Sequence, residues 1–103
     1  MLKITNAEYL GNYRIHLSFN DGRNGEADLH ALTDTRPQSV FAAFADEVFV
    51  RQFGLEHGTL CWPGERDVAV EYLYFLTFRD EPALQALFRQ WGYLDERNSA
   101  MVA

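Results

Sequence analysis

One short stretch, residues 13–19, alternates apolar and polar side chains without a break. Its odd-numbered residues are large and apolar, while Arg14, His16 and Ser18 between them are polar. Successive side chains of a strand point to opposite faces of a sheet. The pattern therefore predicts a β-strand with one buried face and one solvated face, and it is the clearest strand in the chain.

Turn-forming residues stand on both sides of this strand. Asn20-Asp21-Gly22 follows it, and a second alternating stretch, residues 23–29, comes next, which predicts a hairpin. Residues 2–10 are rich in β-forming side chains and reach the first strand through the Gly11-Asn12 turn. We therefore expect a three-stranded antiparallel meander at the start of the chain.

The middle of the chain predicts short elements. Residues 39–46 favour a short helix with Ser39 as its N-cap, and residues 48–53 predict a further helical turn that lays Phe49 and Phe53 on the core. Residues 55–62 predict a single strand, which Pro63-Gly64 ends.

The C-terminal part predicts two helices. Residues 71–78 are almost continuously apolar, as in a helix that is covered on both sides. Pro82 suits a first helical turn, and apolar residues then recur at helical spacing until Gly92. We expect one α+β domain over residues 1–94, with a small antiparallel β-meander sheet and two or three helices packed on one face. Residues 95–103 predict a flexible tail.

Composition limits the possible functions. Of the 103 residues 48% are apolar, which is enough for one core, but no uncharged run is long enough to cross a membrane. The net charge is −6 and the basic residues are scattered, which disfavours nucleic-acid binding. The N-terminus carries no secretion signal and Cys61 is the one cysteine, so we expect a cytoplasmic protein.

Candidate catalytic and metal-binding groups are sparse. His57 and Cys61 are four residues apart but lack the further ligands that zinc needs. Cys61 lies between apolar neighbours, which favours a small buried residue over a reactive thiolate. Glu65, Asp67 and Glu71 could pair for acid–base chemistry, although an acidic turn is usually solvated. We expect no enzyme, no catalytic residues, no cofactor and no metal.

An aromatic surface is the remaining candidate site. The apolar run at residues 72–78 can meet the C-terminal helix on its second side, or it can meet a partner chain. We expect an interaction surface with the residues Trp62, Glu65, Asp67, Glu71, Tyr72, Tyr74, Phe78 and Trp91. The alternative is a ligand-binding or enzymatic pocket around Trp62, Asp67 and Glu71. A nucleic-acid adaptor with a helix-turn-helix at residues 71–91 is a weaker alternative, because Arg89 is the only cation in its second helix.

The order of several short motifs resembles the bacterial domain-of-unknown-function family 2442. The resemblance spans residues 2–74, followed by a helical extension over residues 75–94. The chain departs from the family pattern at Gly64-Glu65-Arg66 and at Val70, where members usually have Asn-Gly-Ala and Pro. The matching motifs are Phe19-Asn20-Asp21-Gly22, Ala27-Asp28-Leu29, Val40-Phe41, Phe53, Gly58-Thr59-Leu60, Trp62-Pro63, Asp67-Val68 and Glu71-Tyr72-Leu73-Tyr74.

The resemblance implies a role as a partner protein. Members are often encoded beside another small protein and have been suggested to act as antitoxins or regulatory partners. Some relatives append a DNA-binding helix-turn-helix, which the helical extension of this chain does not match because it lacks basic residues. We therefore expect a protein-interaction module that binds another small protein or a second copy of itself, with neither direct nucleic-acid binding nor a membrane association.

Overall fold

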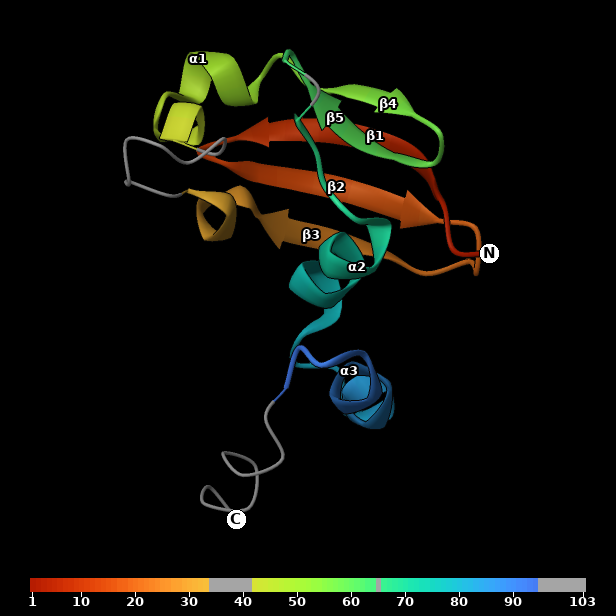
Figure 1. Ribbon diagram of the computed structural model, residues 1–103. Coiled ribbons are helices and arrows are strands. Elements are labelled where there is room, and N and C mark those ends of the chain that lie inside the picture. The colour runs from red at the N-terminus through yellow and green to blue at the C-terminus, as the bar shows by residue number, and fades with distance from the viewer. Residues whose placement is uncertain (34–41, 65, 95–103) are drawn as a thin grey trace.

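The computed structural model describes residues 1–33, 42–64 and 66–94 (Figure 1). It opens with a three-stranded antiparallel sheet in the order β1-β2-β3, formed by Ile4–Gly11, Arg14–Phe19 and Asn24–Asp28. The predicted meander is confirmed. Ile15, Leu17 and Phe19 are buried on one face of β2, while the polar residues between them lie on the opposite face.

Short helices connect the two sheets. The 3₁₀ helices η1 (Leu29–Leu32) and η2 (Ala42–Ala45) precede α1 (Glu47–Val50), whose N-cap is Asp46. The carboxylate of Asp46 accepts a hydrogen bond from the backbone N–H of Val48 at 3.0 Å. The helix predicted over residues 39–46 lies partly outside the described residues, and so does its expected cap, Ser39. Phe49 and Phe53 pack against the core as predicted.

A second antiparallel sheet follows, in the order β4-β5-β6. Its strands are β4 (Gly54–Glu56), β5 (Thr59–Trp62) and β6 (Arg66–Asp67). The prediction of one strand over residues 55–62 is wrong, because the chain reverses at His57-Gly58, where both residues have positive φ. The backbone N–H of Ile4 donates to the Gly58 carbonyl at 2.8 Å and joins this hairpin to the start of β1.

The helix α2 (Val70–Phe78) packs on the apolar face of the first sheet (Figure 1). Four consecutive residues of α2 are buried, Leu73, Tyr74, Phe75 and Leu76. A 3₁₀ turn, η3 (Pro82–Leu84), leads into α3 (Gln85–Trp91), which covers the other side of α2. A helix that is apolar on all sides needs such cover on both sides. The predicted α+β fold is confirmed.

Gly92 ends α3 in the left-handed conformation, with φ of 89°. The backbone N–H of Tyr93 donates to the Phe88 carbonyl at 2.9 Å, and the N–H of Gly92 donates to the Arg89 carbonyl at 3.0 Å. This is a Schellman motif, which satisfies carbonyls at the helix end. It also places the Tyr93 ring 5.2 Å from the Phe75 ring and so closes the α2–α3 contact.

Substitution of Gly92 tests this helix end. A Cβ at this position would meet nothing within 4 Å, so the cost of Gly92→Ala is conformational alone. We expect Gly92→Ala to lower the free energy of unfolding by about 1–2 kcal/mol, and Gly92→Asn to lower it less, because Asn tolerates the left-handed region. Urea unfolding followed by circular dichroism measures both. Equal stability of the Ala variant and the wild type would contradict the expectation.

Candidate functional site

Two of the predicted interaction residues are parts of the core. Trp62 and Tyr74 are each 3% exposed. The indole N–H of Trp62 donates to the Val50 carbonyl at 2.8 Å, and the Tyr74 hydroxyl donates to the Asp21 carboxylate at 2.6 Å. Burial and the bond to Asp21 raise the pKa of Tyr74 to about 12. Both polar tips are therefore satisfied inside the domain, and neither side chain forms an accessible surface.

The other predicted aromatic residues, Tyr72, Phe78 and Trp91, are half-buried. They belong to a cluster of rings between α2 and α3. The Tyr72 ring lies 5.3 Å from the Tyr93 ring, and the Trp91 ring lies 6.0 Å from the Tyr74 ring. The C-terminal helix thus covers much of the aromatic run. Phe78, at the end of α2, also contacts the sheet, with its ring 5.7 Å from that of Phe19.

The predicted acidic residues do not come together in one described site. Asp67 and Glu71 are both exposed, whereas Glu65 lies outside the described residues. A groove of about 560 Å³ includes Trp62 and Asp67, but Glu71 does not line it. The full lining is Glu56, His57, Thr59, Cys61, Trp62, Pro63, Gly64 and Asp67.

Cys61 lines this groove rather than the core, so its expected burial is wrong. Its neighbours Leu60 and Trp62 are buried on one face of β5, so Cys61 lies on the opposite, partly exposed face. There its Sγ lies 3.0 Å from Oε2 of Glu56. The bond to Glu56 and burial raise the pKa of the thiol to about 11. Cys61 is therefore a poor nucleophile at neutral pH. Among the described residues, no three His, Cys, Asp or Glu side chains form a group that could hold a metal ion.

The alkylation rate of Cys61 tests the influence of Glu56. Removing the negative charge with Glu56→Gln should lower the thiol pKa and increase the thiolate population at neutral pH. We expect iodoacetamide to label the variant several-fold faster than the wild type at pH of about 8. The two proteins should react at the same rate in urea, where the contact is absent. Equal rates for the folded proteins would contradict the assignment.

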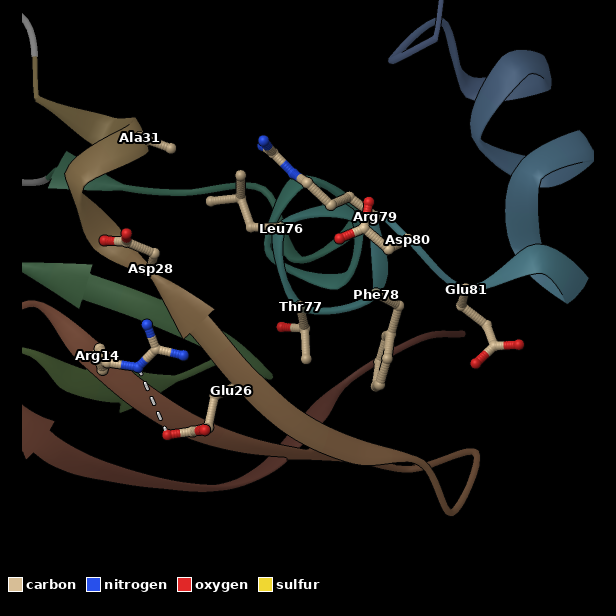
Figure 2. Close-up of a pocket in the computed structure, with 10 residues that line it drawn as sticks. All are labelled: Arg14, Glu26, Asp28, Ala31, Leu76, Thr77, Phe78, Arg79, Asp80 and Glu81. Carbon is tan, nitrogen blue, oxygen red and sulfur yellow. Dashed lines mark ion pairs between the residues drawn. The ribbon is translucent and has the colours of Figure 1, made fainter.

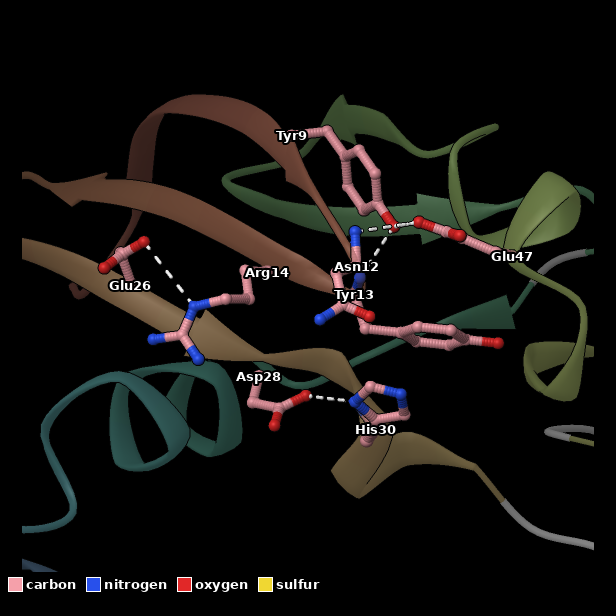
Figure 3. A network of polar contacts seen from close by, with 8 residues as sticks. All are labelled: Tyr9, Asn12, Tyr13, Arg14, Glu26, Asp28, His30 and Glu47. Atoms are coloured by element: carbon pink, nitrogen blue, oxygen red, sulfur yellow. Dashed lines mark hydrogen bonds and ion pairs between the residues drawn. The ribbon is translucent and has the colours of Figure 1, made fainter.

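A polar network joins α1 to the turn between β1 and β2 (Figure 3). The Tyr9 hydroxyl donates to Oε2 of Glu47 at 2.5 Å, and the backbone N–H of Asn12 donates to the same oxygen at 2.9 Å. The N–H of Tyr13 donates to the Tyr9 hydroxyl at 2.9 Å. Asn12 and Tyr13 both have positive φ, which is costly for residues other than glycine. Glu47 therefore holds a strained turn from 35 residues away.

Acid titration tests the role of Glu47. The bond from Tyr9 is the largest cause that lowers the pKa of Glu47 below its ordinary value of 4.5. This contribution to stability is complete above pH 4.5 and is lost as the pH falls through the lower folded-state pKa.

We expect Glu47→Gln to be less stable than the wild type at pH of about 6, and the difference to shrink at pH of about 3. Tyr9→Phe removes the hydrogen bond that lowers the pKa of Glu47 most, so the stability of this variant should also depend less on pH. Thermal unfolding across this pH range provides the measurement. A difference that stays constant with pH would count against the network.

His30 lies on the same end of the sheet and has a structural partner. Asp28 accepts hydrogen bonds from the backbone N–H of His30 at 2.9 Å and from its Nδ1 at 2.7 Å, and the backbone bond is the main cause that lowers the pKa of Asp28. The imidazole stacks on Tyr13, with ring centroids 3.9 Å apart. Both His30 and Asp28 are more than half exposed, so this pair caps η1 at the surface.

A charged groove of about 520 Å³ lies at the edge of the first sheet, beside β3 (Figure 2). Arg14, Glu26 and Asp28 contribute from the polar face of the sheet, and α2 and the loop after it contribute from the other side of β3. The lining residues are Arg14, Glu26, Asp28, Ala31, Leu76, Thr77, Phe78, Arg79, Asp80 and Glu81.

Acidic side chains predominate in this groove. It contains four carboxylates and two guanidinium groups. Arg14 and Glu26 form an ion pair of 3.7 Å in which both side chains are about half exposed, so the pair is weak and can exchange partners. Arg79 lies over the Phe75 ring at 5.0 Å. Asp80 has no hydrogen bond or ion pair with any described residue. The groove can therefore receive cationic groups.

Sequence reasoning identified only Phe78 among the residues of this edge groove. The alternating pattern correctly placed Arg14, Glu26 and Asp28 on a polar strand face, but such a face is normally just solvated. The available signal was the Arg-Asp-Glu sequence at positions 79–81, which ends the apolar helix with three consecutive charges. Only the packing of α2 on β3 brings those charges near the polar strand face.

The fold and this groove define a small α+β domain with a charged groove along one sheet edge. A match over residues 4–78 to DUF2442, a family of proteins of unknown function, shows that the chain belongs to that family. The match includes all of α2, four residues beyond the end of the resemblance seen in the sequence. No curated protein and no solved structure matches the chain. Within the described ranges, no helix has the length and apolar character to span a bilayer.

Proposed function

We propose that this domain is a protein-interaction module that binds a basic partner through the edge groove. The observation that carries the proposal is the composition of the groove, because Glu26 and Asp28 from the sheet and Asp80 and Glu81 from the loop after α2 line the same open space. Because its four carboxylates outnumber its two guanidinium groups, the groove carries a net negative charge that attracts cations and disfavours acidic partners. The net charge of −6 extends that preference to the whole surface.

The shape of the groove favours a protein partner over a small molecule. It is open, and its polar groups are side chains exposed to solvent, whereas small-molecule sites are usually enclosed and mostly apolar. Phe78 and Leu76 provide apolar contacts beside the charges. An apolar centre with a charged rim is the usual anatomy of a protein interface.

A regulatory role toward another small protein fits this surface. An acidic antitoxin-like module would neutralise a basic partner by covering its cationic site, and the domain needs no catalytic group for that purpose. A cytoplasmic location fits a chain with one cysteine, whose thiol carries no internal disulfide.

Charge reversal in the groove tests the proposal. The tagged protein is purified from its host at native levels, and the bound partner is identified and quantified by mass spectrometry. We expect the amount of partner that co-purifies with the double variant Glu26→Lys and Asp80→Lys to be lower than with the wild type by a factor of about ten or more. The reason is that the reversed charges repel a basic surface.

A second double variant provides a matched comparison. Asp67→Lys and Glu71→Lys change the net charge by the same amount, at two acidic residues of the interaction surface predicted from the sequence (the acidic rim). We expect this variant to keep the partner, and circular dichroism verifies that both variants are folded. If only the rim variant loses the partner, the interface lies at the rim and not in the groove. A wild-type protein that purifies as a lone monomer would contradict the proposal.

A further inference from the structure

The strand β3 has a free outer edge. The backbone N–H of Phe19 donates to the Arg23 carbonyl at 2.9 Å, and the N–H of Leu29 donates to the Tyr13 carbonyl at 2.8 Å. These two bonds show which residues of β3 exchange backbone hydrogen bonds with β2. The backbone N–H and C=O groups of the odd-numbered residues of β3 point toward β2. The N–H and C=O groups of Asn24, Glu26 and Asp28 point away from β2. The carbonyl of Asp28, the N-cap of η1, accepts the first hydrogen bond of that helix. No described strand pairs with the remaining outward groups.

This edge is regular, in contrast to the other edge of the sheet. All five residues of β3 pair with β2 without a register shift. The pairing of β1 is interrupted twice, between Ile4 and Asn6 and between Tyr9 and Gly11, and its start is joined to the β4–β5 hairpin. Proteins usually protect sheet edges with bulges, prolines, charged side chains or covering segments. β3 has neither a bulge nor a proline, and its charges are the acidic side chains Glu26 and Asp28.

The edge groove supplies space along this edge. Its lining comes from the polar face of the sheet on one side and from Leu76, Thr77 and Phe78 on the other (Figure 2). The contact of α2 with β3 is close, because a Cβ on Gly25 would lie 3.0 Å from Cγ2 of Thr77. The helix therefore lies beneath β3 and leaves its outer backbone groups beside open space.

We propose that β3 accepts an extended segment of a partner protein as a fourth, antiparallel strand, with basic side chains at alternate positions of that segment. The proposal deepens the proposed function and rests on it. Backbone hydrogen bonds from the segment would satisfy the outward groups of β3. On the polar face, its basic side chains would stand opposite Glu26 and Asp28, where cross-strand pairs of opposite charge are stabilising.

The same charges argue against a second copy of this chain as the added strand. Antiparallel pairing of two β3 strands in the centred register places Glu26 opposite Glu26 of the second copy. Like charges directly opposite each other destabilise a strand pair. The net charge of −6 on each chain adds long-range repulsion. A basic segment removes both costs.

A synthetic peptide tests the proposal on the full-length chain. The probe is acetyl-Thr-Lys-Val-Lys-Val-Lys-Thr-amide, whose three Lys can stand opposite Asn24, Glu26 and Asp28. We expect its titration to shift the backbone amide NMR resonances of these three residues. In antiparallel pairing, the Lys N–H groups face β3 and the Val N–H groups face away.

Backbone methylation distinguishes strand addition from simple charge attraction. N-methylation of two Lys should weaken binding by at least about tenfold, because strand hydrogen bonds are lost, while N-methylation of both Val should leave it within about threefold. A peptide of the same composition with its three Lys contiguous should bind less tightly. The variant Glu26→Thr, which keeps a β-forming residue, should also weaken binding.

Two results would overturn the inference. One is the absence of resonance shifts in β3 at millimolar peptide. The other is an equal effect of the two methylation patterns, which would show that the groove binds cations without adding a strand. The second result leaves the proposed function intact, since that function fails only if charge reversal in the groove does not release the native partner.

Discussion

The fold depends on the burial of α2 from two sides. Four consecutive residues of this helix are buried, and no single surface can cover four consecutive helical positions, which point in all directions around the axis. The sheet covers one side and α3 covers the other, where Phe88 of α3 is fully buried against α2. Gly25 allows the close approach on the sheet side. The domain therefore needs its C-terminal helix to complete its core, although the family match ends at Phe78.

Local patterns predicted the elements that bury one regular face. The alternation of residues 13–19 gave β2, and the apolar run gave α2. The second sheet was missed because a single Gly58 inside a β-rich stretch does not by itself show a reversal, and because His57 before it also adopts positive φ. In addition, β6 has only two residues and exists through its pairing with β5. Sequence alone also could not show which sheet edge remains open, since that depends on where the β4–β5 hairpin docks.

The candidate site was predicted less well for a related reason. Tyr74 and Trp62 have polar tips that suggest a surface, but Asp21 and the Val50 carbonyl satisfy those tips inside the domain. Two acidic residues, Asp21 and Glu47, hold helices to the turns at opposite ends of the first sheet. Part of the acidic excess thus serves the fold, and four other carboxylates line the edge groove beside β3.

The difference between the two edges of the first sheet sets the valency of this domain. Because β1 is irregular and joined to the β4–β5 hairpin, a strand added at β3 would have no equivalent site on the opposite edge. A complex formed in this way would have one-to-one stoichiometry and could not propagate into a fibre. Such a partner strand would end the first sheet on that side.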